Sequence, residues 1–293
     1  MGTEVERKFI VLNNKYDSRI DARRTEALEQ GYITLSSDCS VRVRMSESTS
    51  GGKDSASLTL KGRDRNGERV EFYYRVPAGD EIKQIHDQLC SSGKEKIRFA
   101  ADLTADAAAN TEMTNQADLS RDCTVRVRIS QNKASGATRA QLCIKGPRAK
   151  DKEVIDRPEF EYDIPVEHAR LILDQICSHS ISKTRKYLKR NDAQSDPHVE
   201  WTIDEYDDSR FGGLKLAEVE LKDTNLPPES IHKVKLPDFI AIKRPGKSDQ
   251  MLEVTNTKGF TNSELGRLPA DKVASYVLNA LEQARKMVGK AVA

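Results

Sequence analysis

An internal repeat within the first 185 residues is the feature that most constrains the fold of this chain. Four segments recur in the same order after a further 84 to 88 positions. They are DCSVRVR at 38–44 and DCTVRVR at 122–128, LTLKG at 58–62 and LCIKG at 142–146, EFYYRVP at 71–77 and EFEYDIP at 159–165, and DQLC at 87–90 and DQIC at 174–177. Because a repeated unit sets the architecture before any single motif does, we expect both copies to form the same elements.

Each copy predicts the order strand, strand, strand, helix, strand. Apolar and polar residues alternate in the first three segments, as in strands, and the apolar spacing before Cys90 and before Cys177 is helical. We therefore predict one domain over 1–293, with copy one at 38–98, a connector without strand alternation at 99–121, and copy two at 122–185.

The segments outside the repeat predict further strands at 5–12, 198–206 and 216–222, and a helix near 21–30. A final amphipathic helix is expected over 271–288. Together these elements predict an α+β fold with helices packed outside a sheet or barrel.

Charged residues occupy every second position of several predicted strands, and therefore share one face of each strand. The signs are segregated: EFE and EVE strands carry only acids, whereas RVR and KTR strands carry only bases. The charged positions are Glu4, Glu6, Lys8, Arg126, Arg128, Lys145, Glu159, Glu161, Lys183, Arg185, Asp204, Glu218 and Glu220. An ordinary antiparallel sheet with one solvated face is the alternative explanation for any single strand.

Clusters of opposite sign on facing strands suit a site for a divalent metal and a polyphosphate. Hard cations such as Mg²⁺ prefer carboxylate oxygens and substrate phosphates, and a bound metal offsets the repulsion between neighbouring carboxylates. Phosphate oxygens in turn need lysine and arginine. Closure of the strands into a barrel would concentrate the electric field of these charged side chains in the barrel interior.

Composition excludes several other classes. The net charge is only +2, and aromatic residues make up 5% of the chain, which disfavours a nucleic-acid-binding protein. No apolar run is long enough to span a membrane, so we expect no membrane partner. The five cysteines lack zinc-ligand spacing and are expected to be reduced thiols in the cytoplasm.

The ordered motifs resemble the CYTH superfamily, the triphosphate tunnel metalloenzymes. The resemblance covers nearly the whole chain. Its motifs are EVERKF, QGYI, TVRVR, IKG, RPEFEYDIP, ISKTRKY, WTIDEY, AEVEL and FTNSELGRLP. It implies an antiparallel closed β-barrel enclosing a triphosphate tunnel, with the repeated unit as an addition.

The resemblance also implies roles for the charged positions, with Mg²⁺ or Mn²⁺ as cofactor. Metal ligands would be Glu4, Glu6, Asp204, Glu218 and Glu220. Triphosphate contacts would be Lys8, Arg126, Arg128, Lys145, Lys183 and Arg185. Glu159 and Glu161 would orient a metal-bound water, which makes them catalytic together with Lys8. Thr202 departs from the family pattern, which has an acid at that position.

The activity implied is hydrolysis of a short triphosphate, inorganic tripolyphosphate being favoured. Thiamine triphosphatase and adenylate cyclase use the same tunnel and remain alternatives, as does a non-catalytic polyphosphate or nucleotide sensor. A family barrel needs only one RVR, IKG and EFE set, and copy one has Tyr73 where copy two has Glu161. We therefore expect copy two to form the working tunnel.

Overall fold

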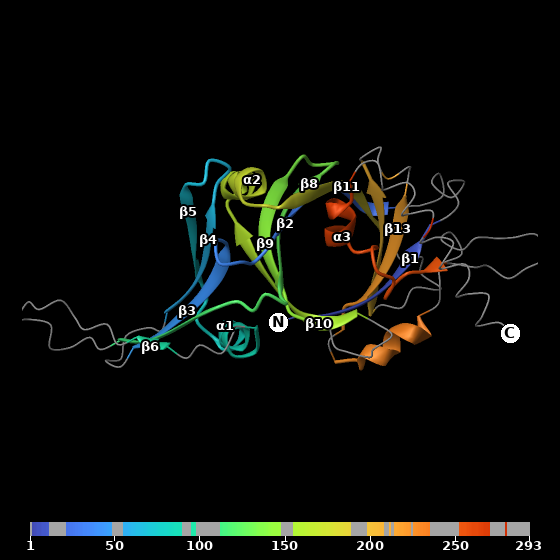
Figure 1. The fold of residues 1–293 in the computed structure, drawn as a ribbon. Helices are drawn as coiled ribbons and strands as arrows, with labels where there is room; N and C mark the ends of the chain where they lie inside the picture. Colours follow the sequence, from blue (N-terminus) through green and yellow to red (C-terminus); the bar gives the residue numbers. More distant parts are fainter. Residues whose placement is uncertain are drawn as a thin grey trace, which may run out of the picture.

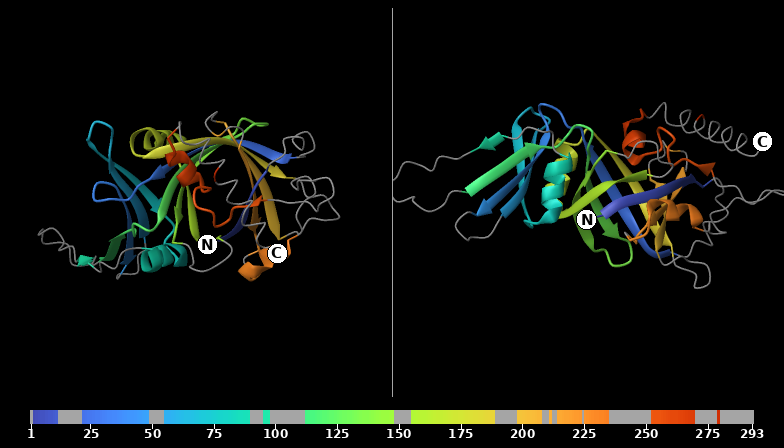
Figure 2. Two further views of the ribbon diagram at one scale, coloured as in Figure 1. Left: turned by 45° about the vertical axis from the view of Figure 1, so that its right-hand side comes forward. Right: turned by 90° about the horizontal axis from the view of Figure 1, so that it is seen from below.

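The structure, a computed structural model, describes residues 2–11, 22–48, 55–89, 95–97, 112–147, 155–188, 198–207, 211, 214–223, 225–234, 252–269 and 279. Its strands form two antiparallel sheets that lie side by side (Figures 1 and 2). One sheet closes into a barrel, and the other remains open.

Eight strands make the barrel. In sheet order they are β10 (Ile155–Ile164), β9 (Thr138–Lys145), β8 (Thr124–Asn132), β2 (Ala22–Ile33), β11 (His179–Leu188), β12 (Val199–Tyr206), β13 (Lys215–Leu221) and β1 (Gly2–Ile10). β1 also pairs with β10, with Glu4 opposite Arg157, and this pairing closes the sheet on itself. The short strand β14 (Leu252–Glu253) pairs with the far part of β1. The predicted closed antiparallel barrel is confirmed.

Strand register fixes which side chains face the barrel interior. Arg126 lies opposite Cys143, and Cys143 lies opposite Glu161, so the three side chains share the inner face. Val125 and Val127 alternate with these residues and are fully buried on the outer face. The same alternation continues around the barrel, so that polar and charged side chains point inward from every strand.

The first repeat copy forms the open sheet. Its strands, in sheet order, are β5 (Arg69–Val76), β4 (Ser55–Arg63), β3 (Ser40–Ser48), β7 (Glu112–Asp118) and β6 (Glu95–Ile97). The pairing between β3 and β4 repeats that between β8 and β9: Ser40 lies opposite Lys61, as Thr124 lies opposite Lys145. The predicted order of strand, strand, strand, helix, strand is present in both copies.

Helices pack between the open sheet and the barrel (Figure 1). α2 (Val166–Gln175) follows β10, and α1 (Asp80–Gln84), continued by the π-helical turn η2 (Ile85–Leu89), follows β5. Both elements share one apolar core with β3, β4, β8 and β9. The ring of His168 in α2 meets Phe72 and Tyr74 of β5 at centroid distances of 5.6 and 5.9 Å. The open sheet is thus attached to the barrel by its apolar face.

Two short helical elements pack against the barrel in separate apolar clusters. The 3₁₀ turn η4 (Pro228–Lys233) buries Ile231 against residues of β1, β12 and β13. α3 (Asn262–Arg267) buries Leu265 in a second cluster that includes Ile10 and Ile181. No helix among the described residues is long and apolar enough to span a bilayer.

The helix predicted near residues 21–30 is wrong, because this segment belongs to the strand β2. Its sequence, DARRTEALEQ, has a high intrinsic helix propensity. β2 pairs along most of its length with both β8 and β11. The hydrogen bonds and packing of a central barrel strand outweigh the local preference for a helix.

Two other predictions from the sequence concern the connector at 99–121 and the helix at 271–288. The connector at 99–121 was expected to lack a strand, yet β7 lies within it and pairs with β3. Its polar sequence EMTNQAD shows no alternation of apolar residues, so the strand depends on its neighbour rather than on pattern. The helix predicted at 271–288 lies outside the described residues, except for helical Asn279.

Gly31 shows how closely α2 approaches the barrel. A Cβ atom at this position would lie 2.4 Å from Cδ2 of Leu173 and 2.5 Å from Sγ of Cys177. We therefore expect Gly31→Ala to lower the free energy of unfolding by about 1–3 kcal/mol, measured by urea titration. Gly79→Ala is the matched control, because a Cβ there meets no atom within 4 Å. Equal effects of the two substitutions would contradict this packing.

Candidate active site

The barrel encloses a cavity of about 680 Å³ that is lined by side chains from all eight strands. Its lining includes most of the charged positions predicted from the sequence. These are Glu4, Glu6, Lys8, Arg126, Arg128, Lys145, Glu159, Glu161, Arg185, Glu218 and Glu220. The barrel thus brings together strands that are up to 216 positions apart, the separation of Glu4 and Glu220.

A basic cluster occupies one part of the cavity, where β8, β9 and β10 meet. It consists of Arg126, Arg128, Lys145 and Arg157. Lys145 is buried and donates hydrogen bonds to Glu4 and, at 3.0 Å, pairs with Glu159. The guanidinium groups of Arg126 and Arg128 both contact Oε1 of Glu161, at 3.1 and 3.0 Å. Four cations within one wall are the kind of groups that an anion with several oxygens requires.

An acidic cluster lies on the adjoining strands β1 and β13 and consists of Glu4, Glu6, Glu218 and Glu220. Glu6 lies opposite Glu220 in the sheet register. Nζ of Lys8 lies between two of these acids, 3.2 Å from Oε1 of Glu6 and 2.8 Å from Oε1 of Glu218. The two clusters meet where Lys145 and Arg157 contact Glu4.

Crowding of carboxylates changes their acidity. Burial raises the pKa of Glu6 to about 7, because the attraction of Lys8 is offset by the charges of Glu4 and Glu218. Burial also raises the pKa of Glu220. For Glu4, burial would act in the same direction, but Lys145 and Arg157 hold its pKa well below the usual range. The acidic cluster therefore contains one carboxyl group, Glu6, that binds a proton near neutral pH.

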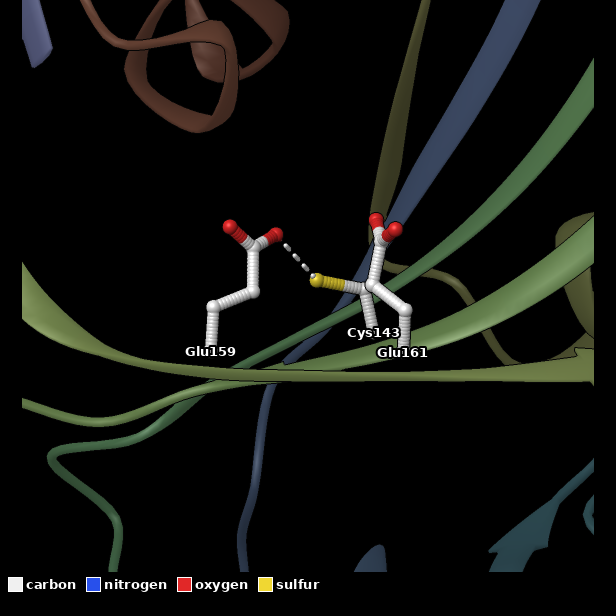
Figure 3. A group of neighbouring side chains, drawn as sticks. All are labelled: Cys143, Glu159 and Glu161. Atoms are coloured by element: carbon white, nitrogen blue, oxygen red, sulfur yellow. Dashed lines mark hydrogen bonds between the residues drawn. The ribbon is translucent and has the colours of Figure 1, made fainter. Parts of the chain in front are cut away.

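Cys143 lies within the basic cluster and was missed by the sequence analysis. Its thiol donates a hydrogen bond of 3.0 Å to Oε1 of Glu159, and Glu161 lies on its other side (Figure 3). Burial raises the pKa of this thiol to about 12 despite the nearby Arg126, so it remains protonated. The donor atoms of Cys143, Glu159 and Glu161 lie within 4.8 Å of one another. Because one of its three donors is a protonated thiol rather than an oxygen, this group suits a hard cation less well than the acidic cluster does.

Lys183 and Asp204 also point to the interior side, but they do not line the cavity. Both side chains are 0% exposed and form a direct ion pair. Oδ1 and Oδ2 of Asp204 accept two further hydrogen bonds from Arg185, at 2.6 and 2.7 Å. Arg185 also reaches Glu218 at 2.5 Å and does line the cavity. Asp204 thus holds a cavity-lining arginine in place.

Other lining residues were missed for identifiable reasons. Arg157 precedes Glu159 by two positions on β10, so the alternation rule would have found it. Arg24 lies on β2, which was read as a helix; its guanidinium carbon lies 3.8 Å from the centroid of the Tyr187 ring. Arg139 and Glu200 also line the cavity and carried no motif signal.

The segment after β14 contributes to the cavity lining through residues 256–267. A capping box starts α3 there: the Thr261 side chain accepts from the backbone N–H of Glu264, and the Glu264 side chain accepts from that of Thr261. His179 of β11 binds Ser263 at 3.2 Å and stacks on Tyr32 at a centroid distance of 5.2 Å. These contacts hold the closing motif FTNSELGRLP against the barrel.

The chain was compared with protein families, curated proteins and solved structures. No protein-family model matches the chain. The chain is 37% identical over 100 residues to the inorganic triphosphatase of Acetivibrio thermocellus, and the match covers 34% of this chain and 58% of that protein. The chain therefore spans less than two thirds of the length of this relative.

Two solved structures show a distant likeness. The PH1819 protein from Pyrococcus horikoshii OT3 is 18% identical, with 78% of this chain and 85% of that chain covered. The inorganic triphosphatase NE1496 is 16% identical, with 92% and 97% covered; the TM-score is 0.38 for both. Over about one third of its length, this chain is similar to an inorganic triphosphatase.

Proposed function

We propose that this chain is a metal-dependent triphosphatase that converts inorganic tripolyphosphate and water to pyrophosphate and phosphate inside the barrel. The observation that carries the proposal is the adjoining of a basic and an acidic cluster within one cavity. A polyanion needs the first, and divalent cations on its oxygens need the second. The similarity to an inorganic triphosphatase agrees with this chemistry.

The acidic cluster fits a divalent cation. Its donors are carboxylate oxygens, which Mg²⁺ and Mn²⁺ prefer. Burial, together with the charges of Glu4 and Glu218, raises the pKa of Glu6, so a bound cation would stabilise its ionised form. We infer that Glu4, Glu6, Glu218 and Glu220 hold the metal, while Asp204 positions Arg185. When bound, the metal would neutralise charge on the phosphate oxygens.

The protein side chains would bind the substrate and move one proton. Arg126, Arg128 and Lys145 hold the phosphate oxygens, and Lys8 reaches them from the acidic side. Glu159 and Glu161 orient the attacking water and accept its proton as the new P–O bond forms. The P–O bond to the bridging oxygen breaks, and pyrophosphate leaves with its charge stabilised by the arginines and Lys145.

The cavity favours an inorganic triphosphate over a nucleotide. Among the described residues, its aromatic lining consists of Tyr32 and Tyr187, which are 5% and 6% exposed. Tyr187 is already stacked against Arg24. These rings offer little surface on which an adenine or a thiazolium group could stack.

The function is tested by incubating the protein with tripolyphosphate, thiamine triphosphate and ATP in turn, with Mg²⁺ or Mn²⁺. We expect pyrophosphate and phosphate from tripolyphosphate, with turnover reduced at least about 100-fold in Glu6→Gln and in Lys145→Ala. Cyclic AMP from ATP would identify a cyclase instead. Binding of tripolyphosphate without turnover of any substrate would identify a sensor.

Metal activation should depend on pH through Glu6. Its carboxyl group must lose a proton to bind metal, and with a pKa of about 7 it does so only as the pH rises through neutrality. We expect EDTA to abolish turnover, and the concentration of Mg²⁺ giving half-maximal rate to fall as the pH rises from about 6 to about 8. Metal titrations of the hydrolysis rate at each pH measure this. Glu6→Gln should flatten the dependence; an unchanged slope in that variant would exclude Glu6 as its source.

A further inference from the structure

The polar face of the open sheet matches the basic cluster of the barrel, position by position. Lys61 of β4 lies between Ser40 and Glu71, as Lys145 lies between Thr124 and Glu159. The matching ion pairs have similar lengths, since Nζ of Lys61 is 3.2 Å from Glu71 and Nζ of Lys145 is 3.0 Å from Glu159. The open sheet therefore presents a second version of the arrangement that lines the cavity.

This second arrangement faces away from the barrel. The apolar residues of β3, β4 and β5 belong to the core shared with α2 and the barrel, so the alternating polar residues lie on the opposite face. Tyr73 is 53% exposed, and the side chains of Lys61 and Glu71 are 41% and 55% exposed. Figure 1 shows β3, β4 and β5 beside the barrel, with α2 between the two.

The two arrangements differ in their acids. Tyr73 occupies the position that matches Glu161, and Arg75 occupies the one that matches Asp163. At the matched positions, the barrel strands carry three bases, Arg126, Arg128 and Lys145, and three acids, Glu159, Glu161 and Asp163. The open sheet carries four bases, Arg42, Arg44, Lys61 and Arg75, and one acid, Glu71. The open sheet thus lacks the counterpart of Glu161, one of the two groups proposed to act on water, whereas the cations remain and gain a fourth member.

We propose that this face, defined by Arg42, Arg44, Lys61, Tyr73 and Arg75, is a second, non-hydrolytic binding site for condensed inorganic phosphate. The assignment rests on the proposed function, because the ligand is inferred from the phosphate contacts proposed for the basic cluster of the barrel. Thr59 lies opposite both Arg42 and Tyr73, and Ser57 lies opposite both Arg44 and Arg75. These two residues are 7% and 3% exposed, so the charged side chains and Tyr73 form the surface of the face. An open sheet, unlike the barrel, leaves room for a chain longer than three phosphates.

Single-stranded nucleic acid is the competing polyanion, and the face fits it less well. Such sites stack successive bases on several aromatic rings. Tyr73 is the one exposed aromatic side chain on the described polar face of β3, β4 and β5, because Phe72 and Tyr74 point toward α2. Cations at every second position suit the evenly spaced charges of a phosphate chain.

The test measures binding in protein carrying Arg126→Glu, which should not hydrolyse the ligand during the titration. Fluorescence titrations would use long-chain inorganic polyphosphate and, separately, a single-stranded DNA oligonucleotide. Tyr73→Glu with Arg75→Asp, which restores the two acids of the barrel at exposed positions, should weaken polyphosphate binding at least tenfold. Arg170→Glu, an exposed charge reversal on α2, is the matched control and should leave binding unchanged.

Three results would overturn the proposal: no polyphosphate binding in the Arg126→Glu protein, equal binding after the Tyr73 and Arg75 substitutions, or tighter binding of the oligonucleotide. Circular dichroism of each variant distinguishes lost binding from lost folding. Tripolyphosphate hydrolysis by the wild-type protein is measured in the same series. Hydrolysis without second-site binding overturns this inference alone, whereas absence of hydrolysis overturns the proposed function.

Discussion

Replacing Arg126 with glutamate should abolish hydrolysis of tripolyphosphate, with kcat/KM at least about 1,000-fold below the wild-type value. Arg126 is 8% exposed and contacts Glu159 and Glu161 at 3.6 and 3.1 Å. The substitution removes a cation that would bind phosphate, and places a third carboxylate beside two others. The resulting repulsion acts on the substrate and on both proposed catalytic acids. Steady-state release of phosphate measures the effect.

Arg42 provides the matched control for this experiment, since it occupies the equivalent position of the first repeat copy. It lies on β3, opposite Thr59, as Arg126 lies on β8, opposite Cys143. Its strand does not contribute to the barrel, so Arg42→Glu should leave hydrolysis within about twofold of wild type, as is usual for sites distant from the chemistry. The opposite ranking of the two variants would move the active site to the open sheet.

Replacing Asp204 with alanine should lower the free energy of unfolding by about 3–5 kcal/mol. Asp204 and Lys183 are fully buried, and Asp204 also binds Arg185. Burial lowers the pKa of Lys183 to about 8 even with Asp204 present, which shows how costly this ammonium group is to bury. Without the carboxylate, its charge would have no compensating partner in this pair. Urea-induced unfolding, followed by circular dichroism, measures the loss.

Two controls separate this effect from general damage. Lys183→Met combined with Asp204→Leu removes both charges, and should recover much of the stability lost in Asp204→Ala. Glu71→Ala breaks the exposed pair with Lys61 and should cost at most about 1 kcal/mol. If Asp204→Ala were as mild as Glu71→Ala, the buried pair would not stabilise the barrel.

The barrel interior could be predicted from the sequence because strands keep a strict period of two. Glu4 and Glu6, Arg126 and Arg128, and Glu218 and Glu220 each had to share a face once their segments were strands. The structure places all of these residues along the cavity. The repeat likewise predicted two similar series of elements, because matching residues favour matching local structure.

Other features depended on contacts that no local pattern contains. β2 was read as a helix, since its propensity is helical and only its pairing with β8 and β11 makes it a strand. Arg24 of β2 therefore carried no predicted role, although it lines the cavity. Cys143 of β9 carried none because a cysteine adds no charge to the alternating pattern. The complete burial of Lys183 and Asp204 could not be predicted from the sequence either, because exposure depends on how neighbouring side chains pack.

The sequence by itself determined the alternation of charge, the segregation of acids from bases, and the series of elements in each repeat copy, because these follow from covalent order and strand geometry. The sequence also favoured the second copy for the barrel, but only the tertiary structure showed the strand pairing that places it there. β1 pairs with β10 of the second copy, whereas the first copy pairs with β7 and packs its apolar face on α2. Closure depends on pairing between residues 149 to 157 positions apart, and such pairing is set by the whole fold rather than by any local segment.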